Sequence, residues 1–424
     1  MIVRRVLKKN CMVNFERFVL ENGLVVLVHE DPTTPMAVMN ILYDVGARDE
    51  DESMTGFAHL FEHLMFEGSK NIPNYDGPLQ KAGGSNNAFT SNDITNYYLT
   101  IPAQNIETGF WLESDRMLEL AFIQEKLDIQ KKVVIEEYKQ RYLNQPYGDI
   151  WLLLRPLVYK KHPYLWPTIG KEIKHIEDAS LEDVKKFFFT HYAPNNANLV
   201  VAGNVTVAQV KELAEKWFGS IPKRDVRKRN LPVEPKQTEE RRMVVEKDVP
   251  ADMLTMAFHM PNRNHPDYIT YDLITDILSS GNTCRLYQAL VKEKQIFTDV
   301  GAYVMGSSDP GLVVVSGKVD KSYTIAEAEK AVWEVLDELK TNTIPEAELQ
   351  KVKNKLDTRE KFSLMSILNI AQKLATSELL GNANKINTEL DEYNQVSTDD
   401  ILRVSSEVFR KENSAVLEYY SKKK

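Results

Sequence analysis

Residues 55–66 read Thr-Gly-Phe-Ala-His-Leu-Phe-Glu-His-Leu-Met-Phe, and this stretch decides how the rest of the chain is interpreted. No Gly or Pro interrupts Phe57 to Glu67, which predicts a helix. Residues four apart on a helix share a face, so His59 and His63 can direct two imidazoles to one point. Glu62 borders the same face, because it follows His59 by three residues and precedes His63.

These side chains suit a divalent metal ion. Zinc prefers neutral imidazole nitrogen, and a catalytic zinc site has three protein ligands and an open position for water. Two His would supply two ligands, and Glu62 would act as general base towards the water. The alternative is a His pair on an amphipathic helix, because apolar residues surround it. The chain has only 8 His, so this pattern would arise by chance in roughly one chain in a hundred.

The order His-x-x-Glu-His is the inverse of the commoner His-Glu-x-x-His. Through it the chain resembles the pitrilysin/insulysin family of zinc peptidases, which includes the mitochondrial processing peptidases and bacterial members close to them. The resemblance implies one Zn²⁺ per chain, bound by His59, His63 and a Glu on a later helix. Residues 133–138 read Val-Val-Ile-Glu-Glu-Tyr. The second Glu, Glu137, takes the place of the family's ligand, with Glu136 as the fallback; alone, such a pair is typical of a solvated helix face.

A second stretch resembles the family near the metal. Residues 83–90 read Gly-Gly-Ser-Asn-Asn-Ala-Phe-Thr, as in the edge strand to which a substrate peptide adds as an extra strand. The resemblance implies that Asn87, Ala88 and Phe89 contact substrate. An ordinary exposed hairpin is the alternative.

The chain departs from the family pattern in two places. Many relatives have an acidic residue seven positions before the ligand Glu, where this chain has Gln130. Many also have an Arg and a Tyr in the later domain that hold the substrate carbonyl or oxyanion. Here Lys292 stands near the place of the Arg, and Arg285 and Tyr287 lie nearby at a different spacing. We expect an unlike partner subunit to supply the pair; a homodimer in which these residues substitute is the alternative.

Composition narrows the class of protein. With 424 residues the chain is long enough for two to three domains. The net charge of −8 lacks the basic footprint of a nucleic-acid-binding protein, so we expect no nucleic-acid partner. We also expect no membrane partner, because no apolar run approaches the roughly 18 residues of a membrane helix. Cys11 and Cys284 are too few for a disulfide framework.

The first ten residues are basic but lack the apolar core and small-residue cleavage site of a signal peptide. We therefore expect a cytoplasmic protein, with a trimmed export signal as the alternative.

The second half repeats the first at an offset of 217 residues. Residues 180–184, Ser-Leu-Glu-Asp-Val, match residues 397–401, Ser-Thr-Asp-Asp-Ile. At the same offset Asn196 matches Asn413, and both precede an apolar strand. The second copy has no His-x-x-Glu-His.

The repeat predicts an α+β fold of two homologous domains, each a mixed β-sheet with helices packed on one face. We expect a metal-bearing domain at residues 1–222 and a homologous domain without the motif at residues 243–424. Residues 223–242 are rich in Pro and charge, which is typical of a linker.

Together these features predict a zinc-dependent endopeptidase that hydrolyses peptides or unfolded polypeptide segments through a metal-activated water. We expect it to act as the metal-bearing subunit of a dimer. A non-catalytic core or scaffold subunit of a peptidase-like complex is the alternative, although such subunits usually have broken ligand sets. A metal-binding protein without hydrolytic activity is a third possibility, which would leave Glu62 unexplained.

Overall fold

The computed structural model describes residues 12–226 and 229–422, so Cys11 and the basic N-terminal stretch lie outside the described residues. Contacts between residues divide the chain into two units. The first comprises the chain up to Gln140, Trp166–Leu231 and Glu360–Thr388. The second comprises Arg141–Leu165, Pro232–Arg359 and the chain from Glu389 onward. Among the described residues, no helix combines the length and apolar character needed to cross a membrane.

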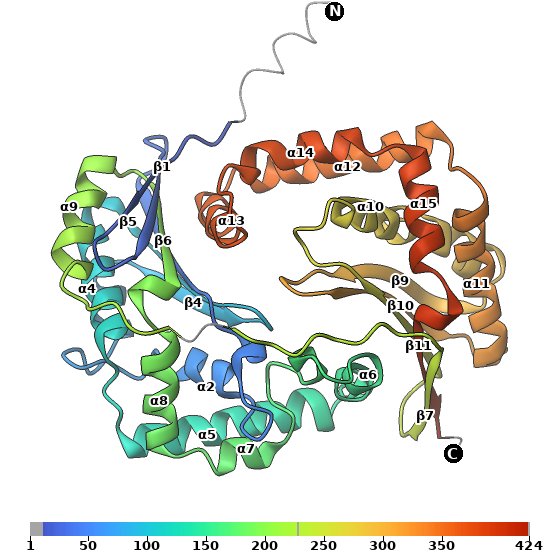
Figure 1. The fold of residues 1–424 in the computed structure, drawn as a ribbon, viewed down its shortest axis with the longest axis horizontal. Helices are drawn as coiled ribbons and strands as arrows, with labels where there is room; N and C mark the ends of the chain where they lie inside the picture. The colour runs from blue at the N-terminus through green and yellow to red at the C-terminus, as the bar shows by residue number, and fades with distance from the viewer. Residues whose placement is uncertain (1–11, 227–228, 423–424) are drawn as a thin grey trace, which may run out of the picture. The chain divides into compact units, whose positions relative to one another are not determined.

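The first unit is built on a mixed six-stranded sheet (Figure 1). Its strand order is β1-β2-β6-β3-β5-β4, and β2 and β6 are parallel while the other neighbours are antiparallel. Gly23 has a φ of 91°, which suits glycine, at the hairpin between the first two strands. The strands span β1 Glu16–Val19, β2 Val25–Glu30, β3 Met36–Tyr43, β4 Ser85–Thr90, β5 Thr95–Pro102 and β6 Ala197–Gly203.

The second unit contains a mixed five-stranded sheet in the order β7-β11-β8-β10-β9. Here β7 and β11 are the parallel pair, as β2 and β6 are in the first sheet. The strands span β7 Arg241–Lys247, β8 Met253–Met260, β9 Phe297–Met305, β10 Gly311–Val319 and β11 Ser414–Ser421. The predicted α+β fold with two related mixed sheets is therefore confirmed.

The internal repeat is visible at the level of hydrogen bonds. Ser180 caps α8 (Leu181–His191) and Ser397 caps α15 (Thr398–Val408), each through a reciprocal bond with an Asp three residues on. The amide nitrogen of Asn196 donates to the carbonyl of the last residue of α8, at 2.8 Å. Asn413 does the same at the end of α15, at 3.0 Å. The matched residues thus have matched structural roles.

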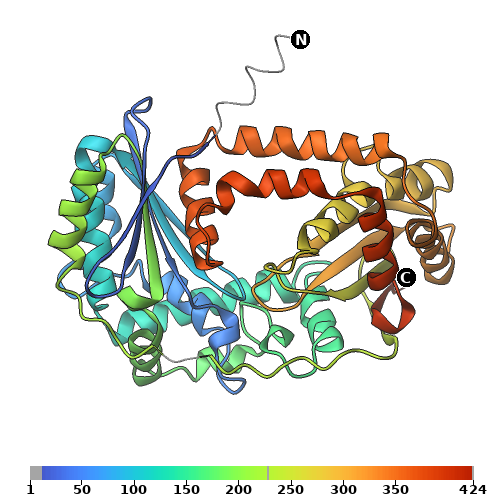
Figure 2. The ribbon, with the colours of Figure 1, turned by 45° about the horizontal axis from the view of Figure 1, so that its top comes forward.

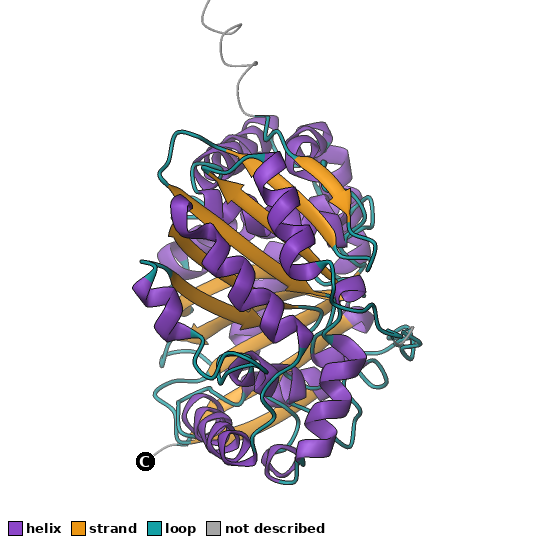
Figure 3. Ribbon diagram, turned by 90° about the vertical axis from the view of Figure 1, so that its left-hand side faces the viewer, coloured by secondary structure: helices purple, strands orange, loops and turns teal. Residues whose placement is uncertain are grey.

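Helices pack against both sheets, and Figure 3 shows helices (purple) lying over strands (orange). In the first unit α4 and α9 lie on one face of the sheet, and α2 and α5 pack against each other near β4. The helices of the first unit are α2 Phe57–Leu64, α3 Asp76–Lys81, α4 Ile106–Leu118, α5 Gln124–Tyr138, α7 Ile173–Glu177, α8, α9 Val207–Phe218 and α13 Ile367–Leu379. The others are α6 Ile150–Val158, α10 Tyr268–Ser279, α11 Ile325–Thr341, α12 Glu346–Ser363, α14 Lys385–Gln395 and α15.

Two helices that correspond in the repeat are exchanged between the units. α6 begins at Ile150 and α13 begins at Ile367, the same offset of 217 residues. α6, from the first half of the sequence, packs in the second unit against β7 and β11. α13, from the second half, packs in the first unit against β3 and β6 (Figure 2). It covers the face opposite α4, which explains why β3 buries every residue from Ala37 to Tyr43.

The predicted linker has ordered contacts within the first unit. The guanidinium of Arg224 donates to the carbonyl of Leu118 at 2.7 Å, and that of Arg229 pairs with Asp44 and Asp49 at 2.6 Å. The domain limits drawn from the sequence stay a prediction.

Candidate metal centre

The predicted helix around His59 is α2. It begins after Gly56, whose φ of 90° suits glycine. Its buried face comprises Phe57, Ala58, Leu60, Phe61 and Leu64, so the histidine face is left for other contacts. The acidic stretch before the helix supplies its cap, because the two carboxylate oxygens of Glu50 accept the N–H groups of Gly56 and Ala58, both at 2.9 Å.

The structure brings together three of the predicted site residues. The Nε2 atoms of His59 and His63 lie 3.6 and 3.5 Å from one carboxylate oxygen, Oε2, of Glu137. One ligand atom from each residue can be chosen so that all three lie within 4.8 Å of one another. Ligand atoms on a tetrahedral zinc with bonds of ~2.0–2.1 Å lie about 3.3 Å apart. The side chains of His59, His63 and Glu137 are 12, 25 and 19% exposed, so the cluster faces a partly open position.

The packing of α2 against α5 produces this convergence. Glu137 lies in the last turn of α5 and faces α2, whereas its neighbour Glu136 points elsewhere. The carboxylate of Glu136 is 59% exposed and pairs with Lys139 at 2.7 Å. Of the two candidates, Glu137 therefore has the geometry of a ligand.

Glu62 lies beside the cluster on α2. Burial raises the pKa of its carboxyl group above the ordinary value, and the charge of Glu137 adds to this shift. Thr90 of β4 and the imidazole of His63 oppose it. Glu62 thus has a carboxyl group whose affinity for a proton is increased next to the candidate metal position.

β4 forms an edge of the first sheet and contacts α2. Asn87 and Phe89 are exposed and Ala88 is half-buried. The N–H of Ala88 donates to the side-chain oxygen of Asn87 at 2.8 Å, since alternate residues of an edge strand turn their N–H away from the neighbouring strand. The three predicted substrate contacts therefore lie on an unpaired strand edge near the cluster.

A buried ion pair that sequence reasoning missed lies behind α2. Arg116 and Glu113 of α4 are each 1% exposed and are joined by two hydrogen bonds, of 2.8 and 2.6 Å. The rings of Phe66, Tyr75 and Tyr97 surround the guanidinium, with centroids at 5.3, 4.6 and 4.4 Å. A pair three residues apart is typical of a helix surface, so the sequence contained no signal for this cage.

Gln130 and two of the candidate residues of the later domain, Arg285 and Lys292, have local partners. The side chain of Gln130 donates to Glu67 at 2.6 Å. In the second unit, Arg285 forms a two-bond pair with Glu348, at 3.0 and 2.8 Å. Lys292 lies 3.5 Å from Gln288, and Tyr287 begins the π-helix Tyr287–Glu293. Arg285 is therefore already engaged in an ion pair within its own unit.

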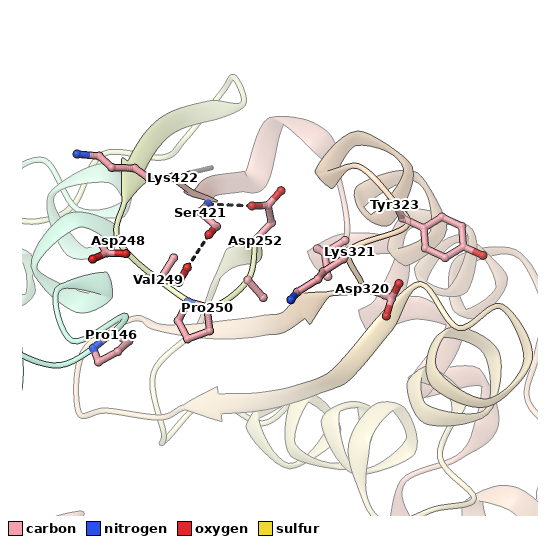
Figure 4. Close-up of a pocket in the computed structure, with 12 residues that line it drawn as sticks. Pro146, Asp248, Val249, Pro250, Asp252, Asp320, Lys321, Tyr323, Ser421 and Lys422 are labelled. Carbon is pink, nitrogen blue, oxygen red and sulfur yellow. Dashed lines mark hydrogen bonds between the residues drawn. The ribbon is translucent and has the colours of Figure 1, made fainter. Parts of the chain in front are cut away.

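The second unit also contains a cavity of about 700 Å³ (Figure 4). Asp252 accepts the N–H of Ser421 at 2.8 Å, and the hydroxyl of Ser421 donates to the carbonyl of Val249. Asp320 accepts the N–H of Ser322 at 2.9 Å. The described lining of the cavity includes neither His nor Cys, and Asp252, Ser421 and Asp320 form hydrogen bonds with the backbone. The cavity therefore lacks a ligand set like that of the α2–α5 cluster.

Comparison with known proteins identifies the class. The family model described as "Insulinase (Peptidase family M16)" matches residues 25–147, and that described as "Peptidase M16 inactive domain" matches residues 178–356. The two models together cover more than half of the chain. The chain therefore belongs to peptidase family M16, the pitrilysin and insulinase family of zinc proteases.

Individual relatives agree with this assignment. "Zinc protease PqqE" of Helicobacter pylori is 29% identical over 408 residues, covering 95% of this chain and 92% of that protein. The beta subunit of the mitochondrial-processing peptidase of Saccharomyces cerevisiae is 28% identical over 207 residues, 48% of this chain and 44% of that subunit. A crystal structure of a protease from Helicobacter pylori has a TM-score of 0.90 at 28% identity, covering 96% of this chain and all of that one. A Pseudomonas fluorescens M16 inactive-domain structure, 17% identical with a TM-score of 0.87, shares the fold.

Proposed function

We propose that this protein is a zinc-dependent endopeptidase that hydrolyses peptides or unfolded polypeptide segments. The observation that carries the proposal is the convergence of His59, His63 and Glu137 from two helices, with Glu62 beside them. Neutral imidazole nitrogen and carboxylate oxygen are the donors that zinc accepts, and separations of 3.5–3.6 Å suit its small coordination sphere. When bound, zinc lowers the pKa of a water towards ~7 and polarises a carbonyl.

Glu62 moves the protons of this reaction. Its carboxylate takes a proton from the attacking water and then delivers it to the leaving amine nitrogen, so the group ends as it began. Burial, which raises the pKa of Glu62, helps the carboxyl group to hold the proton between the two transfers.

The free edge of β4 binds the substrate in this proposal. An extended peptide pairs with the backbone of Asn87, Ala88 and Phe89 and is thereby placed along the face of α2. Backbone pairing requires an extended chain, so the substrates are peptides or unfolded segments rather than folded domains.

A partner subunit completes the site. Arg285 is held by Glu348, which argues against its use as the substrate-binding arginine and favours an unlike subunit that supplies an Arg and a Tyr. In the homodimer alternative Lys292, Arg285 or Tyr287 serves instead. The cytoplasmic location stays a prediction of the sequence; the Escherichia coli structure described as a periplasmic protease is 16% identical and shares only the fold.

Two substitutions separate the roles of the ligands and the base. Glu62→Gln keeps the ligands but removes the base, so we expect zinc content near one per chain and a loss of cleavage of at least a hundredfold. His63→Ala removes a ligand, so we expect loss of both zinc and cleavage.

The measurement is zinc content by atomic emission together with cleavage of a quenched fluorescent peptide, with and without the candidate partner subunit. Cleavage by Glu62→Gln at the wild-type rate contradicts the assignment of the base. Zinc-free wild-type protein after loading favours the scaffold alternative.

A further inference from the structure

One short segment bonds to both helices that carry the candidate ligands. The backbone N–H of Lys171 donates to the hydroxyl oxygen of Thr55 at 2.7 Å, just before α2 begins. The carbonyl of Lys171 accepts the hydroxyl of Tyr138 at 3.3 Å, at the end of α5 and next to Glu137. We call residues 169–177 the clasp, because their backbone joins the start of one ligand helix to the end of the other.

The imidazole of His175 makes two further contacts between the clasp and Thr55. Its Nδ1 lies 3.2 Å from the backbone nitrogen of Thr55 and 2.8 Å from the Thr55 hydroxyl oxygen. The backbone N–H is only a donor, so Nδ1 must carry a lone pair. The hydroxyl already accepts the N–H of Lys171, so its own hydrogen is free to point to Nδ1. Both contacts therefore require an imidazole that is neutral and protonated at Nε2.

The backbones of the clasp and of the segment before α2 are closely packed where they meet. A Cβ on Gly56 would lie 2.8 Å from the carbonyl oxygen of Ile169, and one on Gly170 would lie 3.1 Å from the carbonyl oxygen of Thr55. Thr55 is fully buried. A change in the hydrogen bonds of Thr55 therefore displaces the first turn of α2, which contains His59.

We propose that His175 is a positioning residue of the metal centre: its neutral Nδ1 fixes the start of α2 relative to the end of α5, and protonation releases this anchor and weakens metal binding. The inference rests on the proposed function only in that His59, His63 and Glu137 bind zinc. A protonated imidazole donates at both nitrogens, so it sets an N–H against the N–H of Thr55.

Charged groups on the surrounding elements are already paired or exposed. Lys171 pairs with Glu52, from the segment before α2, at 2.9 Å. On α5, Lys131 donates to the carbonyl of Ala179 at 2.9 Å. Besides Lys171, the charged residues at and beside α7 are Glu172, Lys174, Glu177 and Asp178, all exposed. At the start of α2, the buried carboxyl group of Glu50 accepts the N–H groups of Gly56 and Ala58. The specific contacts of His175 are therefore those to Thr55, which the test must isolate.

Two variants of the full chain isolate them. In His175→Asn the side-chain oxygen can occupy the place of Nδ1 and accepts hydrogen bonds without titrating. His175→Gln is equally non-basic, but its amide extends one bond further. Zinc dissociation constants are measured by chelator competition at pH 7.5 and at pH 5.5. The ligand histidines are common to all three proteins, so their protonation cancels in the comparison with wild type.

At pH 7.5 we expect His175→Asn to bind zinc within about threefold of wild type and His175→Gln about tenfold more weakly, as for residues that orient metal ligands. At pH 5.5 we expect His175→Asn to bind about tenfold more tightly than wild type. Equal pH dependence in wild type and His175→Asn overturns the inference. Wild-type affinity in His175→Gln at both pH values also overturns it.

Hydrogen exchange in the zinc-free proteins gives a second test. The amides of residues 52–58, corrected for intrinsic exchange, should lose protection at pH 5.5 in wild type and keep it in His175→Asn. Protection that does not differ overturns the inference. Zinc binding with the expected ratios but no peptide cleavage, with the candidate partner subunit present, supports the clasp and refutes the peptidase. Cleavage without these ratios does the reverse. Absence of zinc binding in every variant overturns both.

Discussion

Glu50 shows how one side chain can hold a functional helix in place. Its carboxylate is 8% exposed and bonds two N–H groups at the start of α2. Burial raises the pKa of this group to about 8, against the opposing effect of the two N–H bonds. The folded protein therefore retains a proton that the unfolded chain releases at a lower pH.

We expect Glu50→Gln to lower the free energy of unfolding by ~1–3 kcal/mol at pH 5.5, because both oxygens of the protonated carboxyl group have lone pairs for the two N–H groups, whereas the amide sets an NH2 donor against one of them. The contribution of Glu50 is fully present below its ordinary pKa of 4.5 and is lost as the pH rises through about 8. The difference in the free energy of unfolding between the variant and wild type should therefore become smaller from pH 5.5 to pH 8.5. Urea unfolding at both values checks this; a gap that widens with pH would contradict it.

At the scale of the element, β4 combines an unpaired edge with proximity to α2. Its inner side pairs with β5 in register, Ala88 opposite Tyr97, and its outer side has the N–H of Ala88 bonded only locally, to Asn87. The strand can thus accept another strand without losing its place in the sheet.

Ala88→Pro removes one outward N–H and places a ring on the edge, so it should obstruct strand addition while the β4–β5 ladder remains. We expect kcat/KM for a quenched peptide to fall about tenfold or more, mainly through KM. Zinc content and the melting temperature should match wild type. Phe89→Pro is the control, because its N–H faces β5 and its loss should lower stability. Unchanged KM in Ala88→Pro would argue against β4 as the substrate strand.

At the scale of the whole molecule, α6 and α13 each pack into a core formed mainly by the other half of the sequence. α13 covers the face of the first sheet formed by Leu27, Val38, Leu42 and Val200, all at most 1% exposed. The metal-bearing half of the sequence therefore has a core that the other half completes.

Leu374→Ala in α13 removes a fully buried side chain from this core, so we expect the free energy of unfolding to fall by ~2–5 kcal/mol. The control is Phe362→Ala at the end of α12, a side chain 69% exposed, for which we expect a change within about 0.5 kcal/mol. Urea unfolding followed by circular dichroism measures both. Equal stability of the two variants would contradict the role of α13.

Particular residues show how far the sequence predicts this molecule. The offset of 217 residues matched Ser180 with Ser397, and both residues cap a helix, because a capping box is a local pattern. The spacing of His59 and His63 predicted one helix face for the same reason. The pairing of Arg116 with Glu113 inside an aromatic cage, and of Thr55 with His175, depends on segments far apart in the chain, which no local pattern reports.

The exchange of α6 and α13 also sets an order of events during synthesis. When residue 222 has been made, the strands of the first sheet exist, but the helix that covers Leu27, Val38 and Leu42 ends only at Leu379. At typical elongation rates that interval is roughly ten to thirty seconds. Throughout it an apolar sheet face is uncovered on the ribosome, so the nascent chain should bind chaperones there until α13 emerges.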